Sequence, residues 1–281
     1  MNINIDDLVR HVGNLPPLPQ AAQKALALIR DPGASMSSIS KVLEKDQVLT
    51  SLILRMANSA YYGIIYPVGT VQQATVILGQ STIQSLILAA SVAPFLERPV
   101  PGYGLERGEL WRHAIGTAAG ARIVAEPFGR QIAEEAYHAG LLCDIGKLAF
   151  EYLLRKENLK STDWKSLSFE DLENKYFGIN HAALGAEIAR RWRLADPLIA
   201  AINFHHNPNL AGDHDLLASA VHVADCAMMM MGLGIGIDGL QYSLNEYAFN
   251  KVGWNVEKME RLFNNINQYV IESEAFIGIR K

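Results

Sequence analysis

An acidic side chain stands inside the apolar stretch Ala139-Gly140-Leu141-Leu142-Cys143-Asp144-Ile145-Gly146-Lys147. The stretch lies within residues 131–154, where apolar residues recur with the spacing of a helix. A buried carboxylate needs hydrogen bonds, a cation or a metal ion as its partner. The sequence therefore predicts a helix that carries a paired Asp144, with Cys143 beside it. Alternatively, Asp144 hydrogen-bonds a neighbouring helix and Cys143 is a small core residue.

Helical spacing also dominates on both sides of this stretch. Counted from residue 48, apolar residues follow at offsets of one, four, five and eight positions; counted from residue 83, they follow at offsets of three, four and seven. Ser35 and Thr70 are predicted N-caps. Alternation typical of strands is almost absent, so an all-α fold is predicted. The remaining helices are expected at residues 71–78, 81–96, 105–125, 169–176, 181–193, 196–204, 215–231 and 256–271.

A loop rich in proline and glycine, Arg98-Pro99-Val100-Pro101-Gly102-Tyr103-Gly104, is the best internal boundary. We expect an N-terminal helical part at residues 1–97, a helical core at 98–231, and a loop with a terminal helix at 232–281. Residues 234–239 match G-x-G-x-x-G, but they follow a methionine-rich helical run and not a strand. A loop is therefore favoured there over a dinucleotide site.

Composition excludes several classes of protein. The 281 residues are 49% hydrophobic and 19% charged, which is typical of a globular protein. Two cysteines cannot form a disulfide framework, which favours a reducing cytoplasm. No signal peptide or membrane span is expected. The net charge is −4 and no cluster of basic residues is present, so binding to nucleic acid is not favoured.

Further residues with metal-ligand chemistry are spread over the predicted helices: His113, His181, His205, His206 and Asp225. Imidazole and carboxylate groups are ligands for Zn, Fe and Mn. If they converge with Asp144, they form a mononuclear or dinuclear site that can activate water against a phosphoester. Taken alone, His113 is more often a hydrogen-bonded structural histidine than a ligand, and spacing alone does not show convergence.

The order of these residues resembles the HD superfamily of metal-dependent phosphohydrolases. The resemblance matches His113 to the family's first histidine, Asp144 to the aspartate of its His-Asp pair, and Asp225 to its last aspartate. His181 and the pair His205-His206 match the additional histidines of the HD-GYP branch. Segment 44–63, which contains Asn58-Ser59-Ala60-Tyr61-Tyr62, is similar to the HDOD domain (HD-related output domain) of bacterial signalling proteins, as are segments 15–19 and 71–79.

Two departures from the HD pattern affect the expected function. Cys143 stands where the His-Asp pair has its histidine, so a possible ligand is a soft thiol. The Gly-Tyr-Pro element of cyclic-di-GMP phosphodiesterases is missing after His206, which disfavours that activity. The resemblance implies an HD-type helical bundle behind an N-terminal helical subdomain. It also implies a non-catalytic regulatory protein with a degenerate metal site for Fe, Mn or Zn.

Two other functions stay open. In a metal-dependent phosphohydrolase acting on a nucleotide or another phosphoester, Asp144 would bridge ions or orient water, and Lys147 would offset phosphate charge. In the other function, the protein binds a nucleotide or a second messenger without hydrolysing it. For a regulatory protein, we expect a protein partner at Arg55, Asn58 and Tyr61; alternatively, Asn58 caps the chain and Tyr61 packs internally.

Overall fold

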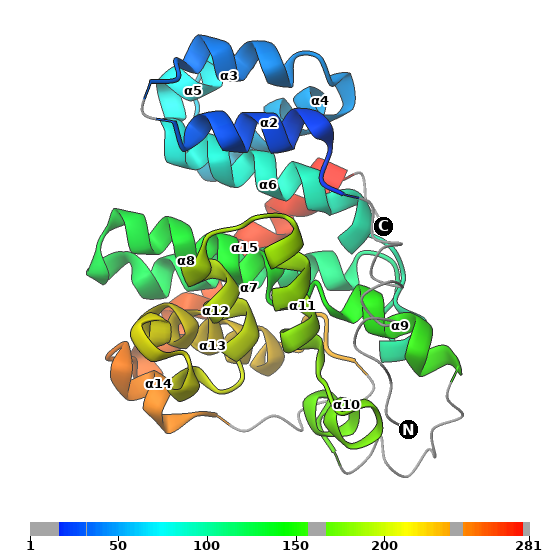
Figure 1. Ribbon diagram of the computed structural model, residues 1–281. Coiled ribbons are helices and arrows are strands. Elements are labelled where there is room, and N and C mark those ends of the chain that lie inside the picture. Colours follow the sequence, from blue (N-terminus) through cyan, green and yellow to red (C-terminus); the bar gives the residue numbers. More distant parts are fainter. Residues whose placement is uncertain (1–16, 32, 157–166, 237–243, 278–281) are drawn as a thin grey trace. The chain divides into compact units, whose positions relative to one another are not determined.

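The computed structural model describes residues 17–31, 33–156, 167–236 and 244–277, and its regular elements are helices (Figure 1). No strand occurs in these ranges, where an isolated backbone bridge joins Val100 to Leu105. The predicted all-α fold is therefore confirmed. The α-helices are α2 (Gln20–Ile29), α3 (Met36–Leu43), α4 (Gln47–Ala57), α5 (Val71–Leu78), α6 (Gln80–Leu96), α7 (Glu109–Ala125), α8 (Arg130–Leu142), α9 (Lys147–Lys156), α10 (Phe169–Phe177), α11 (His181–Arg191), α12 (Asp196–Phe204), α13 (Asp215–Met230), α14 (Glu246–Lys251) and α15 (Val256–Ile277).

The described chain forms two compact units, one of residues 17–95 with 268–277 and one of residues 96–267. Helix α15 supplies residues to both units. The expected three-part division, with boundaries at residues 97 and 231, stays a prediction.

Helices α3 and α5 of the unit of residues 17–95 begin with side-chain caps. Ser35 accepts a hydrogen bond from the backbone of Ser38, and Thr70 accepts one from Gln73, which confirms both predicted N-caps. Each cap satisfies a backbone N–H that has no partner within its helix. The core of this unit is aliphatic and includes the completely buried Leu43, Ile53, Val71, Ile83 and Leu86.

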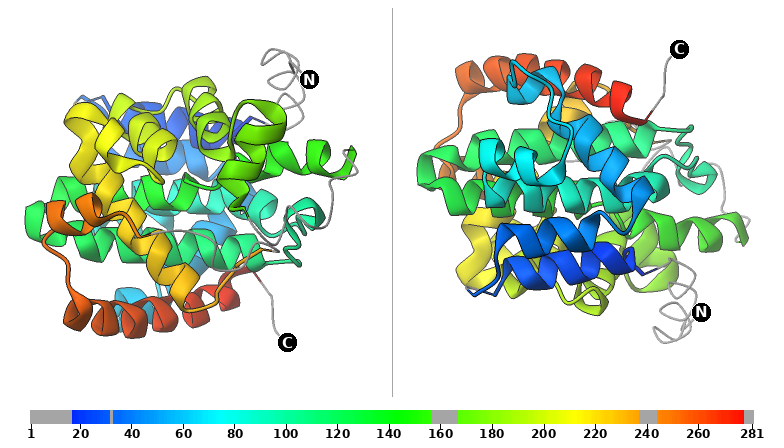
Figure 2. Two further views of the ribbon diagram at one scale, coloured as in Figure 1. Left: turned by 90° about the horizontal axis from the view of Figure 1, so that it is seen from below. Right: turned by 90° about the horizontal axis from the view of Figure 1, so that it is seen from above.

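Small residues bring α7, α8 and α13 close together in the unit of residues 96–267 (Figure 2). A Cβ atom on Gly140 of α8 would lie 2.8 Å from the carbonyl oxygen of Thr117 on α7. One on Gly120 of α7 would lie 3.0 Å from the Cβ of Ala224 on α13. Glycine therefore allows backbones to approach where larger side chains would separate them. The three helices carry or adjoin His113, Asp144 and Asp225.

The expected single helix over residues 131–154 is wrong. Helix α8 ends at Leu142, residues 143–146 form a turn, and α9 begins at Lys147. The chain turns here because Gly146 approaches the start of α11, where an added Cβ would lie 1.9 Å from the carbonyl oxygen of His181. Asp144 consequently lies in a turn between two helices and not in the middle of one.

Among the described helices, none combines the length and apolar composition that spanning a membrane requires.

Candidate metal centre

His113 and Asp225 form a buried pair between α7 and α13. The Nε2 of His113 lies 2.7 Å from Oδ1 of Asp225, and its Nδ1–H donates to the carbonyl oxygen of Leu233 at 3.0 Å. Burial acts to lower the pKa of His113, but the hydrogen bond to Asp225 and the charges of Asp144 and Asp225 outweigh it, so the pKa is raised. The two ring nitrogens of His113 are therefore held between the Leu233 carbonyl and the Asp225 carboxylate.

Asp144 projects from the turn into the same space. Its Oδ2 accepts a hydrogen bond from Nζ of Lys147 at 2.8 Å and lies 3.5 Å from Nε2 of His113. Its Oδ1 lies 3.3 Å from Nε2 of His181. Burial acts to raise the pKa of this carboxyl, but the charge of Lys147, followed by those of the histidines, holds it well below its usual range. Asp144 is therefore a carboxylate paired with the ammonium of Lys147.

His205 has an imidazole nitrogen without a partner in the described part of the chain. Its Nδ1–H donates to the carbonyl oxygen of Ile202 at 2.8 Å, while the buried Nε2 accepts no hydrogen bond there. The side chain is completely buried, and burial lowers its pKa to about 4. A neutral imidazole with an unused lone pair is the form that binds a metal ion. An orphaned buried acceptor is otherwise costly.

His181 and His206 face each other, with their Nε2 atoms 2.9 Å apart. His181 is completely buried at the start of α11, where Asn180 caps the helix. His206 is half-buried. Burial is the main cause that holds its pKa well below the usual value, and the charges of the other histidines lower it further. The rings of His205 and His206 are also close, with centroids 3.9 Å apart.

These side chains can be grouped by the distances between their donor atoms. Within each of three groups, one ligand atom from every residue lies within 4.8 Å of the others. Two groups share Asp144 and two share His205, so the donors are contiguous. The groups are His113/Asp144/Asp225, Cys143/Asp144/His205 and His181/His205/His206. Mixed nitrogen and oxygen donors of this kind suit Zn, Fe or Mn, and the orphaned Nε2 of His205 fits such an ion.

The matching family model is the HDOD domain, which covers residues 15–208. This chain belongs to the HDOD family. A crystal structure named "Putative phosphohydrolase from Shewanella amazonensis SB2B" is 24% identical, has a TM-score of 0.72, and is matched over 94% of this chain and 97% of that one. An HDOD domain protein of unknown function from Geobacter sulfurreducens is 21% identical with a TM-score of 0.66, over 98% and 96% of the two chains.

An uncharacterized protein of Treponema pallidum (strain Nichols) is 26% identical over 225 residues. The match covers 78% of the HDOD chain and 43% of the treponemal protein. The chain therefore spans less than half the length of this relative.

The thiol of Cys143 faces the centre but is engaged with the backbone of α8. Its Sγ–H donates to the carbonyl oxygen of Gly140 at 3.2 Å. Burial, and then the charge of Asp144, raise the pKa of the thiol well above its usual value. The protonated thiol is therefore the stable form in this HDOD protein.

Two groups that sequence reasoning missed support the histidines. The carbonyl oxygen of Leu233 fixes the ring of His113, and a backbone group has no signature in sequence. Glu173 binds His181. The sequence does indicate a buried position for Glu173, because this residue lies four residues from both Phe169 and Phe177, on the buried face of α10. An acid on such an apolar stripe is the same pattern that drew attention to Asp144.

The predicted partner residues lie in the unit of residues 17–95. The side-chain amide of Asn58 binds both backbone groups of Val68, at 2.9 and 2.7 Å, and so closes a loop. Arg55 is exposed on α4, and the ring of Tyr61 packs against Tyr62 and Tyr269.

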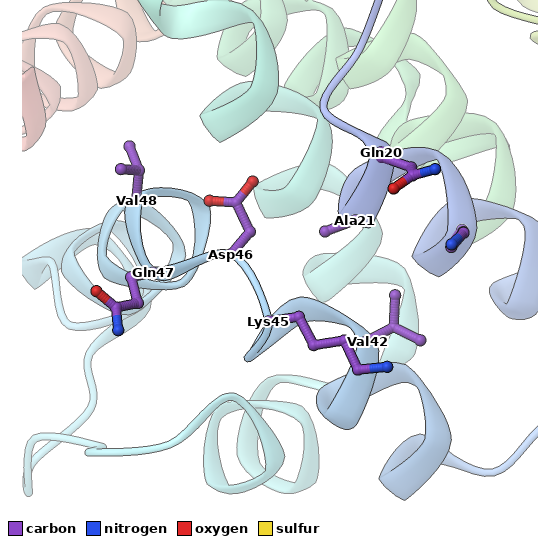
Figure 3. A pocket seen from close by; sticks show the side chains of 8 residues that line it. Gln20, Ala21, Val42, Lys45, Asp46, Gln47 and Val48 are labelled. Carbon is purple, nitrogen blue, oxygen red and sulfur yellow. The ribbon is translucent and has the colours of Figure 1, made fainter.

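The same unit carries a pocket of about 470 Å³ where α2, α3 and the start of α4 meet (Figure 3). The side chain of Asp46 caps α4 at this pocket by accepting a hydrogen bond from the backbone of Leu49. The lining residues are Gln20, Ala21, Lys24, Val42, Lys45, Asp46, Gln47 and Val48.

Proposed function

We propose that this HDOD protein is a regulatory module that holds a divalent metal ion in a buried His/Asp centre and does not turn over a phosphoester. The observation that carries the proposal is the orphaned Nε2 of His205 beside the Asp144 carboxylate. The ligands are His113, Asp144 and Asp225, extended by His181, His205 and His206. A divalent ion bound among them would polarise a phosphoester oxygen or lower the pKa of a bound water.

The enclosure of the donors favours a regulatory role over hydrolysis. Relative exposures are 1% for His113, 2% for Asp144 and 5% for Asp225. A phosphoester must place its oxygens directly against the ion, which requires open coordination positions. Lys147 is also already paired with Asp144. This ammonium compensates the carboxylate and is not directed to a substrate phosphate.

A regulatory protein acts through a partner, and we place the partner on the unit of residues 17–95. Apolar side chains are strongly exposed there, with Ile65 at 84%, Tyr66 at 83% and Val76 at 80%. Large apolar side chains exposed to this degree can be covered by a protein partner. If Arg55 and Tyr61 belong to the surface, replacing each by alanine weakens binding of an isolated partner, measured by titration calorimetry. Unchanged affinity in both variants would remove them from it.

Metal analysis of three proteins tests the proposal. Wild type is expected to retain about one or more Zn, Fe or Mn ions per chain, and Asp225→Asn to lose them. The control is Asp215→Asn on the same helix, since Asp215 pairs with Lys251 and belongs to none of the three donor groups. Less than about a tenth of an equivalent in metal-supplemented wild type would overturn metal binding. Turnover of nucleotides or phosphomonoesters that Asp225→Asn abolishes would establish the hydrolase alternative instead.

A further inference from the structure

Glu173 is a completely buried carboxylate that lies outside the three donor groups. One oxygen, Oε2, accepts hydrogen bonds from the backbone N–H of His181 at 2.6 Å and from its Nδ1–H at 2.7 Å. The other, Oε1, accepts one from the hydroxyl of Tyr103 at 2.5 Å. An isolated buried charge is costly, and three hydrogen bonds compensate this carboxylate.

The two bonds to His181 fix both the position and the chemical state of its ring. Donation from Nδ1 leaves Nε2 as the nitrogen directed to the centre, where it lies 3.3 Å from Asp144 and 2.9 Å from His206. A carboxylate behind an imidazole also strengthens the opposite nitrogen as a metal ligand. Both effects act on one atom, Nε2 of His181.

Tyr103 connects Glu173 to the other side of the centre. It is completely buried, its ring packs against Phe169 with centroids 4.5 Å apart, and Nζ of Lys147 lies 5.8 Å from the ring centroid. Lys147 in turn donates to Asp144. The contacts therefore run from Asp144 through Lys147, Tyr103 and Glu173 to His181, which lies beside Asp144 again.

We propose that Glu173 is a positioning residue of the metal centre, which orients His181 through Nδ1 and strengthens its Nε2 as a ligand, with Tyr103 holding the second carboxylate oxygen. This inference rests on the proposed metal binding. Glu173 lies outside the three donor groups, so it would act on a bound ion through His181.

Glu173→Gln tests the inference because it keeps the shape of the side chain and removes its charge. The affinity for Zn²⁺, measured by competition with a chelator, is expected to fall about 10- to 100-fold. The downfield NMR signal of the His181 Nδ1 proton, assigned by its loss in His181→Gln, is expected to move upfield. Glu187→Gln is the matched control, since Glu187 lies on α11 and pairs with Arg190 at the surface. It should change neither readout.

Lower thermal stability of Glu173→Gln with unchanged Zn²⁺ affinity and an unmoved Nδ1 proton would overturn the inference. If Glu173→Gln does not fold, Tyr103→Phe takes its place. The Zn²⁺ affinity should then fall and the His181 Nδ1 proton should move upfield, both by less than expected for Glu173→Gln. Unchanged Zn²⁺ affinity together with an unmoved Nδ1 proton would again overturn the inference. Wild type that binds no Zn²⁺ would instead refute the proposed function. The proton signal of the metal-free protein would still decide whether Glu173 positions His181.

Discussion

Replacing Gly146 by alanine should disrupt the metal centre without removing any ligand. The added Cβ would lie 1.9 Å from the carbonyl oxygen of His181 and 2.7 Å from the backbone nitrogen of Gly185. Ordinary contact begins at 3.4 Å, so the backbones must separate by about 1.5 Å. Both obstructing atoms belong to the backbone of α11, which cannot yield by changing a rotamer. His181 is therefore expected to move away from Asp144.

Overpacking a core lowers the free energy of unfolding by about 1–3 kcal/mol. A collision of a Cβ atom with backbone atoms at this distance should cost at least as much as the upper end of that range. We expect Gly146→Ala to lower the free energy of unfolding by about 3 kcal/mol and the Zn²⁺ affinity by at least about tenfold. Urea unfolding and chelator competition measure the two quantities. Gly185→Ala is the graded control at the same crossing, because its closest contact is a side-chain carbon of Ile202 at 3.2 Å. Wild-type stability and affinity in Gly146→Ala would refute the reasoning.

Three further variants test the electrostatics. Lys147→Met leaves the Asp144 carboxylate without its ammonium partner. In urea unfolding of the metal-free protein, the free energy of unfolding should fall by about 3 kcal/mol. A variant as stable as wild type would contradict this expectation. Burial, and then Arg122, lower the pKa of His138 from 6.5 to about 3, so the unfolded chain binds a proton more readily and stability falls as pH falls between these values. In His138→Gln the free energy of unfolding should fall less steeply with falling pH, by about 1.4 kcal/mol per pH unit. A slope equal to that of wild type would count against a lowered pKa of His138. Because the raised pKa of Cys143 keeps its thiol protonated, we expect no thiolate-to-cobalt charge-transfer band in the Co²⁺-loaded protein. The metal affinity of Cys143→Ser should equal that of wild type. A charge-transfer band that is present in wild type and lost in Cys143→Ser would show that Cys143 is a ligand.

The fold was accessible from the sequence because helical periodicity is a local property. Ser35 and Thr70 cap the helices where their positions predict. The turn at residues 143–146 was not accessible, because it depends on the contact of Gly146 with the distant His181. Apolar residues continue on both sides of that turn, so their spacing predicts one uninterrupted helix.

The candidate site shows the same division between local and distant information. Residue types identified the donors, and the resemblance to HD proteins ordered them, but neither gives a distance between helices. Glu173 escaped notice because a single acid in an amphipathic helix usually faces water. The contact of Leu233 with His113 is made by a backbone carbonyl, which every residue possesses.

The proposed function depends on a metal ion bound by His113, Asp144 and Asp225, with the donor set extended by His181, His205 and His206. Anomalous diffraction at the zinc edge, from crystals grown with Zn²⁺, tests this claim most directly. We expect a peak about 2.0–2.2 Å from donor atoms of His113, Asp144 and Asp225, with the His113 to Asp225 hydrogen bond replaced by coordination. A structure with that hydrogen bond intact and no peak among the three side chains would contradict it.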